Sequence, residues 1–422
     1  MSPQSRVEPE RQAVSSEAAE RYVPLEKSKR QGIGLCLSGG GYRATLFHMG
    51  ALRRLNECGV LTREDFRSVC SVSGGSIAAA ALAAALARIK PQASSGAIAA
   101  DVWNREFREP LRNFTKSNIR TGAVARRLLP WNWFRSSTGV EALARTYEKR
   151  LTPLPLASLP HRPNFVFCST DMAYGVSWVF ERDRMGDYQA GYKSPPSPSY
   201  PTGLAVAASS CFPPVFNPLP IKVGPDELTG GRASPGKERD TTINGLRLTD
   251  GGVYDNMGLE PVWKDHECVL VSDAGGLFAY EGDKGLFSRL QRYVGIQERQ
   301  SGALRKRWLI SNFLAHEMEG TYWGISSAVA NYGYPDGYPK AFAKDVIAEI
   351  RTDLDAFSGA EAAVLENHGY LLADAALRKH VQTLVPTPVP PVQIPHPEWM
   401  DKGRAKDALK DSSKRKLLGR RN

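Results

Sequence analysis

The 422-residue sequence lacks long apolar runs and paired cysteines. Its longest uninterrupted apolar stretch, residues 77–86, is about half of the roughly 20 residues that a bilayer-spanning helix needs. No apolar h-region stands in the polar residues 1–30, which we expect to form a flexible leader rather than a secretory signal. The cysteines stand singly at positions 36, 58, 70, 168, 211 and 268, so no C-x-x-C spacing indicates a zinc site or a disulfide framework. We therefore expect a cytoplasmic protein without a metal or other cofactor.

The net charge of +11 is spread unevenly along the chain. Basic residues concentrate in 105–135 and in 398–422, which predicts an anionic partner for these segments. The first segment also carries Trp131, Trp133 and Phe134, which we expect to enter the head-group region of an anionic membrane surface. The alternative is that these rings pack against the core. We expect no nucleic acid, because neither a helix-turn-helix pattern nor an aromatic stacking module accompanies the charge.

Strand-like and helix-like segments alternate in the first part of the chain. Residues 32–59 and 66–90 each read as an apolar strand, a glycine-containing turn and a helix. This alternation predicts an α/β fold with a parallel sheet that is covered on both faces. A basic, tryptophan-containing insertion, about 91–160, interrupts the pattern. Further strands are predicted at 164–170, 175–182, 246–250 and 268–273, and helices at 204–212, 285–318, 339–350 and 360–380. Residues 386–422 form a Pro-rich segment and a basic tail.

The turn "SVSGG" places Ser73 between a predicted strand and a predicted helix. A serine in this position takes a strained turn that exposes its hydroxyl at the start of the helix, and small neighbours are needed for the close approach there. The helix N-terminus would favour negative charge nearby. The G-x-S-x-G pattern is incomplete, because Ser71 stands where the first glycine belongs. The alternative is an ordinary capping serine in a strand-to-helix turn.

A second turn, "SGGGYRA" at 38–44, also closes a strand and opens a helix. Its successive glycines, Gly39, Gly40 and Gly41, allow backbone N–H groups to converge on an oxyanion. The alternative is a nucleotide phosphate cradle, but neither G-x-x-x-x-G-K-[ST] nor G-x-G-x-x-G is present. Arg43 follows the glycines and could hold a phosphate in a bidentate manner.

A carboxylate ends each of two later strands, Asp250 in "TDGG" and Asp273 in "SDAGG". Either could accept a serine proton as a general base. The histidines after Ser73 do not stand on a strand-end loop, where a Ser–Asp–His triad would place one. A Ser–Asp dyad is therefore favoured, and Asp273 is the competitor of Asp250.

In order along the chain, "SGGGYRA", "SVSGGS" and "DGGVYDNMG" resemble the patatin-like phospholipases. The first motif, continued by "TLFHMGALRRL", also looks like the oxyanion loop and helix of the cytosolic phospholipases A. The resemblance implies a three-layer α/β/α fold over 31–385 with a mostly parallel central sheet. It also implies ester hydrolysis through an acyl-enzyme without a metal.

Carried over residue by residue, the resemblance makes Ser73 the nucleophile, Asp250 the acid/base and Gly39–Gly41 the oxyanion hole. The substrate would be a phospholipid or another acyl-ester lipid, and Arg43 would lie near its head-group phosphate. The protein would contact the membrane peripherally. The alternative, suggested by Ser71, is a catalytically weak or inactive lipid- or ligand-binding regulatory protein with the same scaffold.

Overall fold

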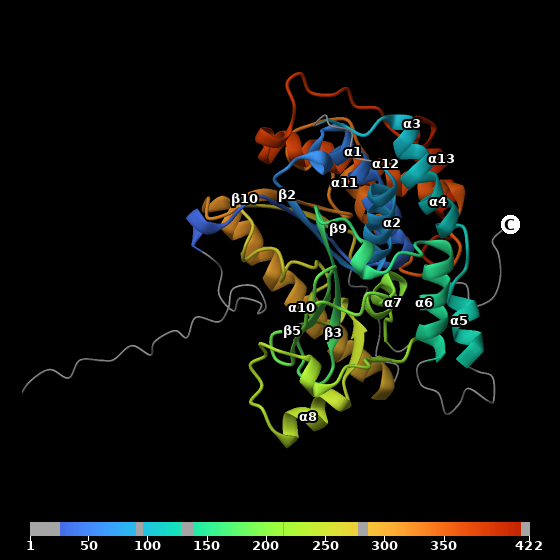
Figure 1. The fold of residues 1–422 in the computed structure, drawn as a ribbon. Coiled ribbons are helices and arrows are strands. Elements are labelled where there is room, and N and C mark those ends of the chain that lie inside the picture. The colour runs from blue at the N-terminus through green and yellow to red at the C-terminus, as the bar shows by residue number, and fades with distance from the viewer. Residues whose placement is uncertain (1–25, 90–95, 128–137, 214, 277–285, 415–422) are drawn as a thin grey trace, which may run out of the picture.

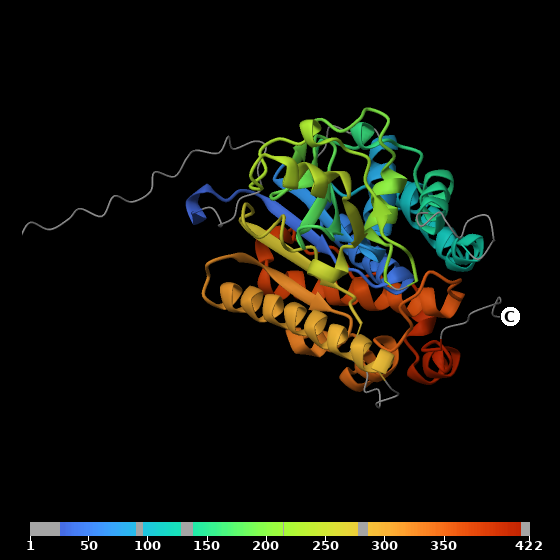
Figure 2. The same cartoon turned by 90° about the horizontal axis from the view of Figure 1, so that it is seen from below.

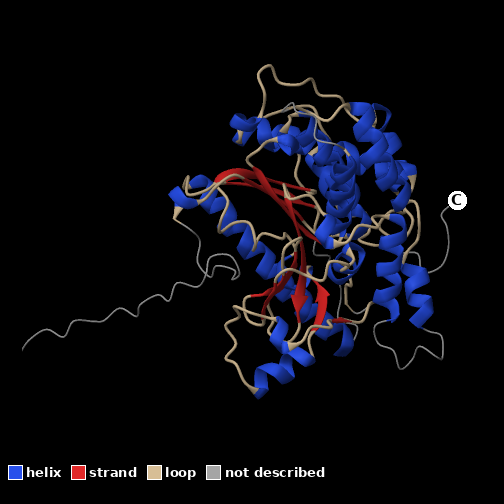
Figure 3. Cartoon of the chain, viewed as in Figure 1, coloured by secondary structure: helices blue, strands red, loops and turns tan. Residues whose placement is uncertain are grey.

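The computed structural model of the protein describes residues 26–89, 96–127, 138–213, 215–276 and 286–414. A central sheet runs through these residues with helices on both sides (Figures 1 and 3). The sheet is ten-stranded, and its main path runs β10-β9-β1-β2-β3-β4-β5-β6. The fold is therefore α/β, as the alternation of strands and helices predicted.

The centre of the sheet is parallel. It consists of β10 (Glu319–Gly324), β9 (Cys268–Asp273), β1 (Ile33–Leu37), β2 (Phe66–Val72) and β3 (Asn164–Asp171). The remaining strands extend it in antiparallel fashion: β4 (Ser177–Phe180), β5 (Met185–Asp187), β6 (Gly191–Lys193), β7 (Leu219–Pro220) and β8 (Arg247–Asp250). Parallel neighbours end at the same edge of a sheet, so the loops after β1, β2 and β9 gather there.

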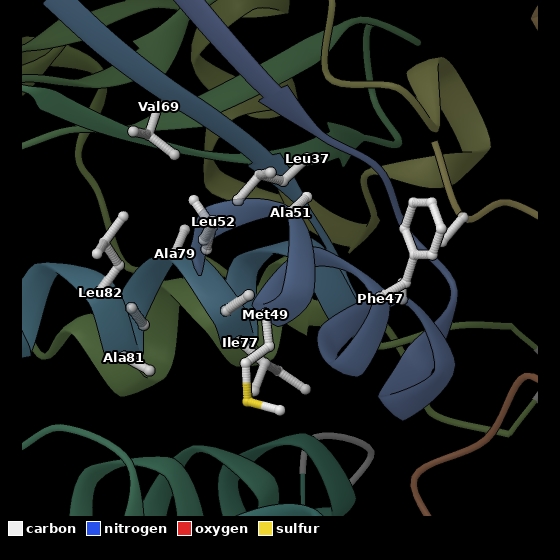
Figure 4. Packing of buried hydrophobic residues seen from close by; sticks show 14 of the residues in the cluster. Leu37, Phe47, Met49, Ala51, Leu52, Val69, Ile77, Ala79, Ala81 and Leu82 are labelled. Atoms are coloured by element: carbon white, nitrogen blue, oxygen red, sulfur yellow. The ribbon is translucent and has the colours of Figure 1, made fainter. Parts of the chain in front are cut away.

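Side chains of the parallel strands alternate between two apolar cores. Leu35 and Leu37 of β1 belong to the larger core, whereas Cys36 belongs to the smaller one. In the larger core the strands pack against α1 (Gly41–Glu57) and α2 (Gly74–Arg88), as Figure 4 shows. The same core includes residues of α12 (Gly359–His380). In the smaller core they meet residues 257–263 and α10 (Leu286–Leu314). Both faces are covered because the strands are apolar on both sides.

The predicted insertion is helical in its described part. It forms α3 (Ala100–Trp103), α4 (Glu109–Thr115), α5 (Arg120–Arg127) and α6 (Thr138–Arg150). α6 packs against α7 (Thr202–Ser209), which leads back to the sheet. Trp103 is buried, whereas Trp131, Trp133 and Phe134 lie outside the described residues.

The C-terminal part differs from the sequence prediction in one strand. Residues 319–324, which were expected to belong to a mostly helical region, form β10 at the sheet edge. The predicted helix at 360–380 is present, and its capping box is formed by Ser358 and Glu361. Residues 386–414 include α13 (Lys402–Leu409) and pack on α1 and α12; for example, Arg54 donates to the Pro390 carbonyl at 2.8 Å.

Within the described ranges, none of the helices has both the length and the hydropathy needed to cross a bilayer.

Candidate active site

Ser73 stands at a strained turn between β2 and α2. Its φ of 50° and ψ of −115° are unfavourable for a residue with a side chain. In the described part of the chain, only His316 shares a positive φ among non-glycine residues. Backbone strain of this kind persists only where the surrounding structure enforces it, and it is common at catalytic residues. The sharp strand-to-helix turn expected from "SVSGG" is therefore present.

The glycines after Ser73 allow the elbow to approach the loop after β1. A Cβ atom on Gly74 would lie 2.0 Å from the Gly41 carbonyl oxygen, and one on Gly75 would lie 2.2 Å from the Leu37 oxygen. Any side chain at either position would overlap main-chain atoms. The start of α2 thus lies directly against the 38–41 loop.

The three glycines of that loop differ in whether their N–H groups have a hydrogen-bond partner. Gly39 donates to the Asn256 carbonyl at 2.9 Å, so its amide is already used. Gly40 is the N-cap of α1 and Gly41 is its first residue. Their amides have no hydrogen-bond partner among the described residues, as is usual for the first turn of a helix. Gly40 has φ 141° and Gly41 has φ 56°. Two amides of the loop are therefore left for an anion, rather than the three predicted.

Asp250 ends β8 and is buried. Its Oδ1 accepts from the Gly252 amide at 2.8 Å, and its register partner on β3 is Ser169. The preceding residue of β3, Cys168, pairs with Val72, which directly precedes Ser73. The Asp250 turn and the serine elbow therefore lie at the same level of the sheet.

Ser209, at the end of α7, connects these two turns and was not singled out from the sequence. Its Oγ accepts from the Ser73 amide at 3.0 Å and donates to the Cys168 carbonyl at 2.6 Å. Its carbonyl accepts from the Gly251 amide at 3.3 Å. The small-residue run "LAVAASSCF" indicated tight packing, but no sequence signal indicated which serine makes these contacts.

Asn256 is a second residue that sequence reasoning missed. Its Oδ1 lies 2.3 Å from a Cβ built on Gly39 and 2.7 Å from one built on Gly252, and its Nδ2 lies 2.9 Å from one built on Gly275. The amide therefore sits where the glycine loops after β1, β8 and β9 converge. Its place six residues after Asp250, within "DGGVYDNMG", is the only signal in the sequence.

Asp273, the competitor of Asp250, has both carboxylate oxygens occupied. Oδ1 accepts from the Gly275 amide at 2.9 Å, and Oδ2 accepts from the Tyr322 hydroxyl at 2.6 Å. Lys306 in turn donates to that hydroxyl at 2.7 Å. These contacts tie the end of β9 to β10 and α10, on the side of β1 away from β2.

Arg43 lies in a different environment from the one expected. It is 3 % exposed, and its Nη atoms donate to the carbonyls of Ala348, Ile350 and Ala274 at 2.8–3.0 Å. Burial lowers the pKa of its guanidinium to about 10, against the opposing effect of Asp273. The side chain thus binds main chain behind the glycine loop, which differs from the predicted contact with a head-group phosphate.

No hydrogen bond joins Ser73 to a histidine among the described residues. His266 is bonded to Ser68 Oγ, His368 to the Ile325 carbonyl and His396 to Glu366. The Ser73 hydroxyl itself has no hydrogen bond to any described residue. Catalytic hydrogen bonds are often long before substrate binds. Nor do the described residues contain a grouping of three His, Cys, Asp or Glu side chains that could bind a metal.

The serine that replaces the first elbow glycine has its own partners. Ser71 Oγ donates to the Val166 carbonyl at 3.1 Å and accepts from Ser76 Oγ at 3.1 Å. Ser76 also lies 2.9 Å from Ser209 Oγ. The hydroxyl is accommodated by hydrogen bonds between β2, β3 and α2, without displacing the turn.

Comparisons with solved structures found several matches of low sequence identity. Human GIVD cytosolic phospholipase A2 matches with a TM-score of 0.39 and 13% identity, covering 59% of this chain and 46% of that one. Its complex with methyl gamma-linolenyl fluorophosphonate gives 0.42 and 14%, with coverages of 92% and 60%. VipD from Legionella pneumophila gives 0.33 and 13%, with coverages of 83% and 67%. The chain thus spans less than half of the first of these structures.

A comparison with curated protein sequences found no significant match. The model of one family, the patatin-like phospholipases, matches residues 35–263. This range is more than half of the chain, and it contains the glycine loop, the serine elbow and the Asp250 turn. The chain belongs to the patatin-like phospholipase family.

Proposed function

We propose that the protein hydrolyses acyl esters of lipids, with Ser73 as nucleophile, Asp250 as general base and the amides of Gly40 and Gly41 as oxyanion donors. Membership of the patatin-like phospholipase family supports lipid acyl hydrolysis as the general activity. The observation that carries the finer proposal is the positive φ of Ser73 beside the amides of Gly40 and Gly41, which have no hydrogen-bond partner among the described residues.

In the proposed reaction, the ester carbonyl oxygen lies against the Gly40 and Gly41 amides. Asp250 accepts the Ser73 proton while Ser73 Oγ forms a bond to the carbonyl carbon. The tetrahedral oxyanion collapses, the C–O bond to the alcohol breaks, and the proton passes to that alcohol. Water then attacks the acyl-enzyme by the same route and releases the fatty acid.

Each of these residues has a support that limits its motion. Ser73 is fixed through its amide by Ser209, and Asp250 through its Oδ1 by Gly252. Such preorganisation matters because donors already aimed at the developing charge need no reorganisation during the reaction. Arg43 is not part of this proposal, because its Nη atoms are bonded to three carbonyls.

The proposal is tested with Ser73→Ala in two assays. Hydrolysis of a short-chain acyl ester should fall by at least about 1,000-fold, and labelling by a fluorophosphonate probe should disappear. Mixed phospholipid vesicles, followed by lipid mass spectrometry, then identify the substrate and the acyl position. Circular dichroism serves as the control for folding.

Two results would overturn the proposal. Retained hydrolysis by Ser73→Ala would exclude this nucleophile. Failure of the wild-type protein to react with the fluorophosphonate would favour the alternative, a family member that binds lipid or another ligand without turnover.

A further inference from the structure

Most of the exposed large apolar side chains in the described part of the chain lie on one helix, α10. They are Tyr293, Ile296, Leu304, Trp308 and Leu314. Tyr293 is 61% exposed and Leu304 is 60% exposed. We call these five residues the α10 stripe. Exposed apolar side chains that gather on one face of a protein commonly mark an interaction site.

The spacing of these residues places them on one face of the helix. At about 100° per residue, the five side chains fall within an arc of roughly 120°. At about 1.5 Å per residue, the stripe is roughly 30 Å long from Tyr293 to Leu314. In Figure 2, α10 runs near the lower edge of the molecule.

The stripe is not the face by which α10 packs on the sheet. That contact is made by Leu309, which is fully buried, and by Ile310 and Phe313. α10 packs against β10 and against α9 (Gly252–Asp255).

The outer face of α10 is amphipathic, because Gln297, Gln300 and Ser311 are exposed on the same arc as the stripe. Within the described residues, the stripe is covered only at Trp308, whose ring packs edge to face against Trp263 with the centroids 4.6 Å apart.

Charge on α10 is almost entirely positive. The helix contains Arg289, Arg292, Arg299, Arg305, Lys306 and Arg307, and a single acidic residue, Glu298. Arg289 and Arg307 are exposed on the arc of the stripe itself. Apolar and aromatic side chains flanked by arginines are the composition of helices that lie in the interface of an anionic membrane.

We propose that α10 docks onto an anionic lipid surface through the stripe. The apolar side chains would enter the head-group boundary, and the arginines would meet lipid phosphates and carboxylates. A second copy of the chain fits this face less well, because a symmetric contact would bring the arginines of the two helices together.

Docking by α10 would bring the membrane beside the candidate active site. Arg305 of α10 donates to the Tyr254 carbonyl at 3.3 Å, and its guanidinium lies 4.8 Å from the centre of the Tyr254 ring. Tyr254 belongs to α9 and lies four residues after Asp250, and its neighbour Val253 is exposed. Delivery of substrate from the bilayer rests on the proposed function, whereas the docking does not.

The test measures vesicle binding by the Ser73→Ala protein, so that lipid hydrolysis cannot alter the vesicles. The test pair is Tyr293→Glu with Leu304→Glu. The matched control is Val389→Glu with Val392→Glu, which changes valines that are 46% and 39% exposed on the Pro-rich segment. On vesicles of phosphatidylcholine with phosphatidylserine, the test pair should weaken binding by at least about 10-fold, and the control pair by less than about 2-fold.

Two further conditions sharpen the result. Binding should weaken on phosphatidylcholine alone and in high salt, because exposed charge interactions are screened. Thermal melting checks that both pairs remain folded. Turnover of a short-chain soluble ester, measured in the active background, should be unchanged by the test pair; an inactive wild type would refute the proposed function and leave the docking result intact.

Insertion of the stripe can be observed directly. All six native cysteines are buried, so Leu304→Cys provides a selective site for an environment-sensitive dye. Its emission should shift to the blue on anionic vesicles, and that of a dye at Val392→Cys should not. Equal binding by the test and control pairs, an unshifted dye, or a dimer that the test pair dissociates would overturn the proposal.

The same assay separates this surface from the predicted contact through Trp131, Trp133 and Phe134, which lie outside the described residues. A Trp131→Ala, Trp133→Ala variant should retain most of the binding if α10 carries the docking. If this variant loses binding and the α10 pair does not, the inference about α10 is wrong.

Discussion

The side chain of Ser209 accepts a hydrogen bond from the backbone amide of Ser73 at 3.0 Å. The backbone carbonyl of Ser209 accepts a hydrogen bond from the Gly251 amide at 3.3 Å. One residue at the end of α7 therefore joins the turn that carries Ser73 to the turn that carries Asp250. The relative position of the proposed nucleophile and base depends on this link.

Replacing Ser209 by alanine should lower kcat about 10- to 100-fold with little change in KM. The Ser73 amide and the Cys168 carbonyl would lose their partner, which costs about 1–3 kcal/mol for each buried group left unpaired. Ser210→Ala is the control, since Ser210 contacts Tyr147 and the Val206 carbonyl instead. Equal effects of the two variants would show that Ser209 is merely a packing residue.

The two candidate carboxylates can be separated by matched amide substitutions. Asp250→Asn should lower kcat by about 100- to 10,000-fold, the range typical of a lost general base. Asp273→Asn should lower it by less than about 10-fold, because its oxygens are already bonded to Gly275 and Tyr322. Steady-state hydrolysis of a soluble ester measures both, and the reverse order would identify Asp273 as the base.

A single methyl group at Gly74 should abolish activity. The Cβ of Gly74→Ala would stand 2.0 Å from the Gly41 carbonyl oxygen, so the elbow and the glycine loop would have to separate. Gly122→Ala is the control, since no atom lies within 4 Å of its Cβ. The comparison is made by fluorophosphonate labelling, and full labelling of Gly74→Ala would contradict the close approach.

We expect the protein to lose stability in mild acid because of the buried His48. The ring is buried between Ser272 Oγ, at 2.8 Å, and the Ser38 carbonyl, at 2.9 Å. Because a carbonyl can only accept, Nε2 carries the proton, and the neutral ring satisfies both contacts. Burial lowers the pKa of His48 to about 4, more than its bond to Ser38 raises it.

The sign follows from proton binding. In the unfolded chain this ring is protonated below about pH 6.5, and in the folded protein only below about pH 4. The contribution of the neutral ring to the free energy of unfolding is therefore complete above pH 6.5. It is lost as the pH falls through 4, by about 3 kcal/mol at most. Urea unfolding between pH 7 and 4 should show a smaller decline for His48→Gln. His161→Gln, which alters an exposed ring, is the control, and identical pH slopes would refute the assignment.

Several elements of the fold followed from local patterns. The strands β1, β2 and β9 and the helices α1, α2 and α12 were predicted from the sequence, because periodicity and turn residues act over a few neighbours. The strand β10 was not readable. Its residues form an edge strand only because β9 provides a partner distant in the sequence.

In the candidate site, too, some features follow from local sequence and others only from tertiary contacts. The sequence by itself determined the sharp turn at Ser73 and the glycine loop, because both depend on φ angles and close approaches that only certain residues permit. Tertiary structure alone decided that Gly39 is bonded to Asn256, that Arg43 binds carbonyls, and that Ser209 joins the turns of Ser73 and Asp250. These contacts join segments that are distant in the sequence, and their meeting is set by sheet order rather than by local conformation.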